Sequence, residues 1–194
     1  MSYKSNSSIS LKKEFGFSIF RSEYDHSPDG VSVSFHFLNS ERFHVEIPGC
    51  GCAVAKLRYD TLGRLTSLAL LDGTGKALPF NGVGVERMEI GYDSYGRVAL
   101  LAARKVNGAP CELSAGCGAS AAGFEYSVEG KLERVLKYDT NNQKSGTVTD
   151  PEKIDTMNVF LGQIRQLCAI FRYRQNFLEM FTQDNVDVIN KLNK

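Results

Sequence analysis

The segment ERFHVEIPGCGC (41–52) contains the residue types that nucleophilic catalysis requires. Cys50 and Cys52 flank a glycine in a loop-like sequence that would expose a thiolate, and His44 and the more distant His36 are candidate bases. A Cys-dependent effector enzyme, a hydrolase or transferase using Cys50 or Cys52 with His44, is therefore one hypothesis. The competing interpretation is that these cysteines are small apolar side chains, which the sequence favours.

The cysteines also suggest a metal site. Cys50 and Cys52 form one close pair, Cys111 and Cys117 form a second, and four thiolates would suit zinc if the two loops met. The spacings are not those of a zinc ribbon or finger. Because the cysteine count is odd at five, we expect reduced, unligated thiols and no cofactor.

Other catalytic signatures are missing from the sequence. It has no GxSxG elbow, no phosphate-binding GxxxxGK[ST] loop, no HExxH and no GxGxxG leading into a helix. This lowers the expectation of an enzyme, so we favour a non-enzymatic role.

The elements that must position these residues are visible in a recurring motif. YDTLGRL begins at Tyr59, YDSYGRV at Tyr92 and YSVEGKL at Tyr126, so the tyrosines are 33 and 34 residues apart. In each copy a glycine follows the tyrosine by four positions and precedes a basic and an aliphatic residue. Apolar residues alternate at period two before each tyrosine, which predicts a strand entering an Asp-Gly turn and a second strand returning. A fourth, degenerate copy starts at Tyr24, and the sequence leaves open whether it is a true repeat.

The motif resembles the YD repeat of RHS proteins, teneurins and the shell subunits of insecticidal toxin complexes. The resemblance covers roughly residues 53–138, and the family repeat is nearer 20 residues. It implies strand-turn-strand units in an antiparallel sheet, and membership of a bacterial toxin, secretion or competition system. Tyr59, Tyr92 and Tyr126 would lie in a row on one face, either as a ligand-stacking site or as cross-strand packing.

The C-terminal part has a helical pattern. Asp150 is a suitable N-cap and Pro151 suits the first helical position. An apolar stripe then predicts a helix of about 28 residues, followed by a break and a short terminal helix around 186–192. The stripe comprises Ile154, Met157, Leu161, Ile164, Cys168, Phe171 and Leu178, broadened by Phe160 and Leu167.

We expect this stripe to cover the sheet, with a homodimer seam or a partner site as the alternative. Arg165, Arg172 and Arg174 form a basic edge beside it, which is typical of a solvated face. The predicted fold class is mainly β with C-terminal α: an antiparallel sheet of repeated β-hairpins packed by a long amphipathic helix. We expect one globular unit, with hairpins in 1–150 and the helical segment in 151–194.

Composition narrows the function classes. The chain has 194 residues, 42% of them hydrophobic and 23% charged, with a formal net charge of +1. This balance does not favour nucleic acid, and the sequence has no apolar run long enough for a membrane span. We expect a cytoplasmic protein, with export by a specialised injection system as the alternative. The favoured function is a protein-binding or assembly module, acting as an immunity protein, adaptor or effector.

Overall fold

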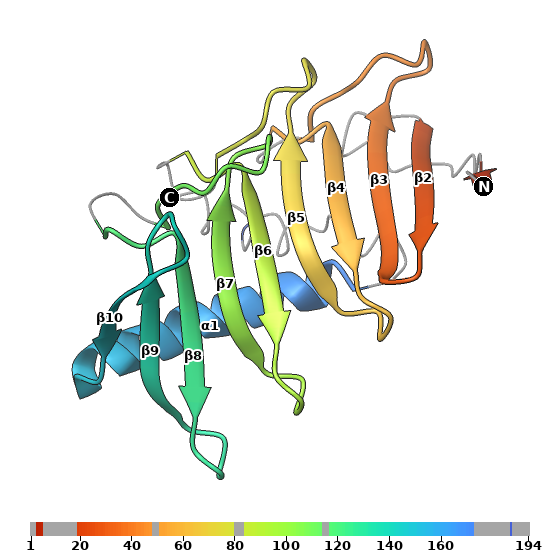
Figure 1. The fold of residues 1–194 in the computed structure, drawn as a ribbon. Helices are drawn as coiled ribbons and strands as arrows, with labels where there is room; N and C mark the ends of the chain where they lie inside the picture. The colour runs from red at the N-terminus through yellow and green to blue at the C-terminus, as the bar shows by residue number, and fades with distance from the viewer. Residues whose placement is uncertain are drawn as a thin grey trace. The chain divides into compact units, whose positions relative to one another are not determined.

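The computed structural model describes residues 3–5, 19–47, 51–79, 84–113, 117–172 and Asp187, and it is mainly β. The chain divides into two compact units. The first contains the described residues up to Leu78 together with Phe171, Arg172 and Asp187, and the second runs from Pro79 to Ile170. Figure 1 shows the strands and the helix of these units.

The first unit is an antiparallel meander in which each strand pairs with the next one along the chain. Its strands are β1 (Tyr3–Ser5), β2 (Ile19–Ser27), β3 (Gly30–Leu38), β4 (Val54–Tyr59) and β5 (Leu65–Leu71). Ala55, Leu57 and Tyr59 are buried while the residues between them are exposed. This is the period-two pattern expected of a half-buried strand, and it is confirmed for β4.

The second unit is also an antiparallel meander, with a helix added. Its elements are β6 (Arg87–Tyr92), β7 (Val98–Arg104), β8 (Ala121–Tyr126), β9 (Leu132–Tyr138), β10 (Lys144–Val148) and α1 (Pro151–Ile170). Figure 1 shows α1 running across one face of the strands of this unit, and α1 contacts β9. The expected fold class, antiparallel β-hairpins with a C-terminal helix packed on them, is confirmed.

The helix begins where the sequence predicts. The Asp150 side chain accepts a hydrogen bond from the Lys153 amide (3.1 Å), and its carbonyl accepts one from the Ile154 amide (2.9 Å). Asp150 is therefore the N-cap, with Pro151 as the first helical residue. The residues of α1 that become buried are Ile154, Leu161, Ile164, Leu167 and Ile170. Four of these, Ile154, Leu161, Ile164 and Leu167, belong to the predicted stripe, whereas Ile170 does not. The predicted members Met157, Phe160 and Cys168 are half-buried.

The end of the helix differs from the prediction. We expected about 28 residues, whereas α1 has 20 and ends at Ile170. The Phe171 carbonyl accepts a hydrogen bond from the hydroxyl of Tyr59. A side chain therefore satisfies a main-chain carbonyl directly after the end of the helix. Leu178 lies outside the described residues, and of the expected terminal helix only Asp187 is described, in helical conformation. In the part of the chain that the structure describes, no helix has the length and apolar character to cross a membrane.

The hairpin of β2 and β3 corrects one detail of the degenerate motif copy. Its turn lies between Ser27 and Gly30, which are paired at the strand ends. Tyr24 pairs with Val33 inside the hairpin. A hairpin forms here, but the Tyr24-Asp25 pair does not make its turn.

Candidate functional site

Asp93 closes the turn that joins β6 to β7. Its carbonyl accepts a hydrogen bond from the Gly96 amide (3.0 Å), and its Oδ1 accepts the amides of Tyr95 and Arg97 (both 2.9 Å). Its Oδ2 accepts Arg97 Nε at 2.7 Å. Gly96 has φ of 78°, which suits glycine. These are the features of a type I turn with Asp93 first and Gly96 fourth, in which the glycine is the left-handed residue.

The turn between β4 and β5 has the same hydrogen bonds. Asp60 Oδ1 accepts the amides of Leu62 (3.0 Å) and Arg64 (2.9 Å), and Oδ2 accepts Arg64 Nε at 2.7 Å. Desolvation by itself would raise the pKa of Asp60, but the hydrogen bonds from Arg64 outweigh it and lower the pKa. The geometry shared by the two turns therefore favours an ionised aspartate.

The turn between β8 and β9 has a serine in place of the aspartate. The Ser127 carbonyl accepts the Gly130 amide at 3.0 Å, and its Oγ accepts the Lys131 amide at 3.3 Å. Gly130 has φ of 85°. The backbone of this turn therefore closes as in the other two, with a weaker side-chain contact.

The hydroxyl of each motif tyrosine has an intramolecular partner. Tyr59 donates to the Phe171 carbonyl (2.7 Å) and Tyr126 donates to the Val98 carbonyl (2.7 Å). Tyr92 Oη lies 3.5 Å from Cys168 Sγ. These contacts support the packing interpretation of the tyrosines, and their role in stacking a ligand stays a prediction.

The basic edge is only partly within the described residues. Arg165 is exposed on α1 and acts on Tyr126: burial raises the pKa of this tyrosine, while the charge and hydrogen bond of Arg165 oppose the rise. Arg172 is exposed, and Arg174 lies outside the described residues. Arg165 therefore has a local partner.

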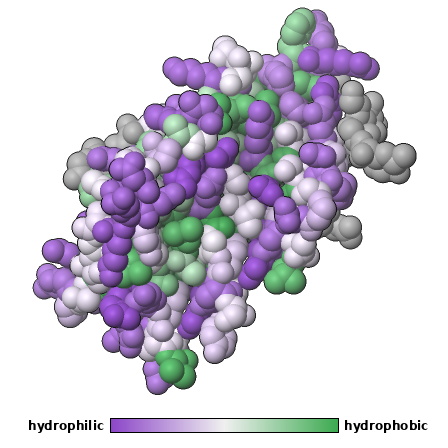
Figure 2. All heavy atoms as spheres, viewed as in Figure 1, coloured by the Kyte–Doolittle hydropathy of each residue, from purple (hydrophilic) through white to green (hydrophobic). Residues whose placement is uncertain are grey.

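The turn tips carry apolar side chains that the fold leaves in solvent. The exposed fraction is 73% for Leu62, 82% for Tyr95 and 100% for Val128. Each lies between the first residue and the glycine of its turn, where polar residues are usual. Figure 2 shows hydrophobic side chains, coloured green, protruding at the tip of the β8–β9 turn. Single exposed apolar residues are common on protein surfaces, but their recurrence at three successive turns makes these residues candidates for contact with another molecule.

Arg97 connects two neighbouring tips of the second unit. Its guanidinium lies over the ring of Tyr95 (4.8 Å to the centroid) and over the ring of Tyr126 (4.6 Å). Its Nη1 also donates to the Ser127 carbonyl at 3.5 Å. We call the side chains of Tyr95, Arg97 and Val128 the tip surface. Arg97 thus contacts the exposed Tyr95 ring and the backbone of Ser127, the neighbour of Val128. Arginine and tyrosine are residue types enriched at the energetic centres of protein interfaces.

No protein-family model and no curated protein matches this sequence.

The residues of the enzymatic hypothesis are not all brought together. Cys52 is 0% exposed and its thiol donates to the Val54 carbonyl at 3.4 Å, so it is not presented to a substrate. His44 is exposed, and its ring stacks on the ring of His36, with His36 Nδ1 3.2 Å from His44 Nε2. Cys50 lies outside the described residues.

The second cysteine pair is held by its own loop. Cys117 Sγ donates to the Ala119 carbonyl (3.2 Å) and accepts the Ala119 amide (3.4 Å). Burial raises the pKa of the Cys111 thiol, with the Lys105 charge opposing the rise. Over the described ranges, no three or more His, Cys, Asp or Glu side chains are grouped to hold a metal ion.

Sequence reasoning missed the tip surface. The motif was defined by its tyrosine, glycine, basic and aliphatic positions, which do not include Leu62, Tyr95 or Val128. The available signal was an apolar side chain between the Asp or Ser that opens the turn and its Gly, in three successive copies. A turn needs no apolar residue at these positions, so their recurrence indicates a surface role.

Proposed function

We propose that this protein is a non-enzymatic protein-binding module and that its tip surface contacts the partner. The observation that carries the proposal is the exposure of Tyr95 at 82% beside Arg97, which is fixed by Asp93. Tyrosine and arginine are enriched among interface residues that contribute most to affinity. Because the turn is rigid, binding would order few side chains and cost little conformational entropy.

The resemblance of the motif to YD repeats supports a place in a bacterial toxin, secretion or competition system. The turns at Asp60 and Asp93 have matching hydrogen bonds. This similarity favours a structure built from repeated hairpins, as the resemblance to YD repeats implies. Within such a system the protein would act as an effector, an immunity protein or an adaptor. Burial of Cys52 removes support from the enzymatic hypothesis for that residue.

The experiment is an affinity capture from the cells that produce the protein, with three baits. The baits are the wild type, a Tyr95→Ser/Val128→Ser variant, and a Val106→Ser control. Val106 is 53% exposed in the turn after β7, at the opposite end of that strand from Tyr95. We expect a partner captured by the wild type and the control but depleted at least tenfold by the tip variant. Equal capture of the partner by all three baits would show that the tip surface does not contact it.

A further inference from the structure

The second unit contains a cavity between its sheet and its helix. The cavity measures about 560 Å³, a size within the range of small-molecule sites. Strands contribute Leu101, Phe124 and Val135 to its lining, and α1 contributes Met157 and Phe160. The lining is mostly apolar, so it would favour a hydrocarbon chain over a polar ligand.

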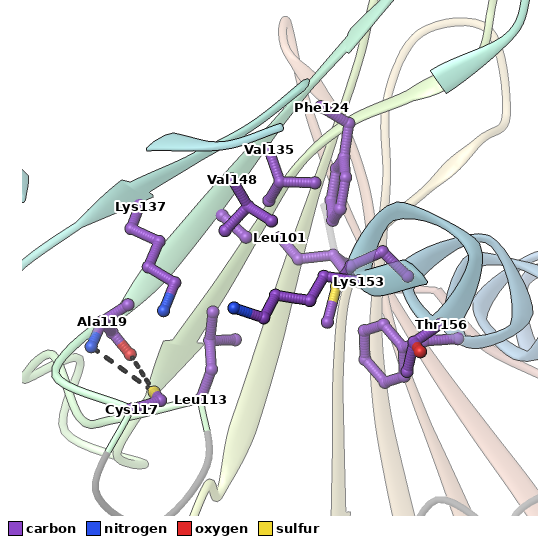
Figure 3. A pocket seen from close by; sticks show the side chains of 13 residues that line it. Leu101, Leu113, Cys117, Ala119, Phe124, Val135, Lys137, Val148, Lys153 and Thr156 are labelled. Atoms are coloured by element: carbon purple, nitrogen blue, oxygen red, sulfur yellow. Dashed lines mark hydrogen bonds between the residues drawn. The ribbon is translucent and has the colours of Figure 1, made fainter. Parts of the chain in front are cut away.

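Two lysines break this apolar lining. Lys137 from β9 and Lys153 from the first turns of α1 both line the cavity, and Figure 3 shows their amino groups directed toward the same side of it. Lys137 is half-buried and Lys153 is exposed. Neither amino group forms an ion pair with a carboxylate of the described residues, although the ion pairs of several other basic residues are present.

Two ammonium groups on one side of an apolar cavity repel each other and favour an anion between them. A carboxylate would accept hydrogen bonds from both amino groups, and its hydrocarbon chain would replace solvent along Leu101, Phe124 and Val135. A neutral alcohol of the same length would gain only the burial of its hydrocarbon chain. A cationic amphiphile would gain the chain contact and meet the repulsion of both lysines.

We propose that this cavity binds a single-chain carboxylate amphiphile of the fatty-acid type, with its carboxylate between Lys137 and Lys153. The site is separate from the tip surface, and neither proposal depends on the other. The cavity therefore adds a small-molecule ligand to a protein whose other surface is assigned to a protein partner.

The test is calorimetric titration of the full chain with sodium decanoate below its micellar concentration. We expect saturable binding with one site, and at least tenfold weaker binding for a Lys137→Met/Lys153→Met variant. A Lys76→Met/Lys131→Met control loses the same charge at positions outside the cavity lining and should bind as the wild type does. Decyltrimethylammonium, with the same chain and the opposite charge, should bind at least tenfold more weakly than decanoate.

Thermal melting of each variant identifies any loss of folding, and an Ala122→Leu variant provides a second route. Ala122 lines the cavity, so a larger side chain should reduce decanoate affinity without changing charge. Absence of saturable decanoate binding to the wild type would overturn the proposal, as would occupation of the cavity by another part of the chain. Equal binding by the lysine variant and its charge-matched control would also overturn it.

Discussion

The hydroxyl of Tyr59 donates a 2.7 Å hydrogen bond to the main-chain carbonyl of Phe171, the residue that follows the end of α1. The two residues are 112 positions apart in sequence, and both are fully or nearly fully buried. A hydrogen bond in such surroundings is shielded from water and contributes to stability.

Tyr59→Phe removes this hydrogen bond while keeping the ring. We expect the free energy of unfolding to fall by about 1 kcal/mol. Urea unfolding followed by circular dichroism measures the change. Tyr95→Phe is the matched control, because its ring is exposed, and it should alter stability by less than about 0.5 kcal/mol. Equal effects of the two changes would contradict the structural role of the Tyr59 hydroxyl.

Two glycines with positive φ should differ in their tolerance of alanine. Gly96 has φ of 78° and a Cβ added there would meet no atom within 4 Å, so Gly96→Ala should cost only the backbone strain of about 1–2 kcal/mol. Gly30 has φ of 139°, and its Cβ would lie 1.9 Å from the Tyr59 carbonyl oxygen. Gly30→Ala should therefore cost more than about 3 kcal/mol. Thermal melting of both variants gives the comparison, and a smaller loss for Gly30→Ala would refute it.

The Asp60 turn gives a prediction in acid. The hydrogen bonds from Arg64, which outweigh desolvation, hold the pKa of Asp60 below its ordinary 3.8. The unfolded chain thus binds the Asp60 proton more readily than the folded chain does. The contribution of the ionised Asp60 to folding stability is therefore present above pH 3.8 and is lost as pH falls through the folded-state pKa. Asp60→Asn keeps an oxygen acceptor without the charge.

The measurement is urea unfolding of wild type and Asp60→Asn at several pH values. The wild type should be more stable at neutral pH, and the difference should shrink as pH falls below about 4. A difference that is independent of pH would show that the ionised carboxylate has no special role in this turn. Asp60→Ala, which loses the side-chain acceptors entirely, should be less stable than Asp60→Asn by about 1 kcal/mol.

His36 gives a second pH dependence. Burial lowers its pKa from 6.5, and Arg21, His44 and Lys56 act in the same direction while Glu23 opposes them. Between the lowered pKa and 6.5 the unfolded chain binds more protons, so stability rises with pH in this window. The stabilisation is complete above pH 6.5 and is lost as pH falls through the window.

The check compares the wild type with His36→Gln in unfolding experiments at pH 7.5 and at lower pH. The wild type should lose more stability on acidification than the variant, because the variant lacks the titrating imidazole. His26→Gln is the control, since His26 is exposed at the end of β2. If His36→Gln and the wild type lose stability equally, the half-buried imidazole of His36 is not the source of the pH dependence.

The predictable parts of this fold are those with local causes. The Asp-Gly turns, the alternation of Ala55, Leu57 and Tyr59, and the Asp150 cap each depend on neighbouring residues, so the sequence pattern was sufficient. The end of α1 was not predictable, because the Phe171 carbonyl is bonded by Tyr59 from a distant strand. A periodic stripe continued past this point and gave too long a helix.

The candidate sites show the same division. Proximity in sequence suggested Cys52 with His44, but the fold buries the Cys52 thiol and places His44 against His36. Arg97 reaches Tyr126 only because β7 and β8 are neighbours, and Lys137 shares a cavity with Lys153 only because α1 returns over the sheet. These are tertiary relationships between segments that no local spacing specifies.

The central claim, that the tip surface contacts a protein partner, is tested most directly by site-specific photocrosslinking in the producing cells. A photoreactive phenylalanine analogue is placed at Tyr95, at Val128 or at Val106, one position in each protein. The account predicts the same discrete crosslinked species from positions 95 and 128 and none from 106. Crosslinks from position 106 alone, or from none of the three positions, would contradict it.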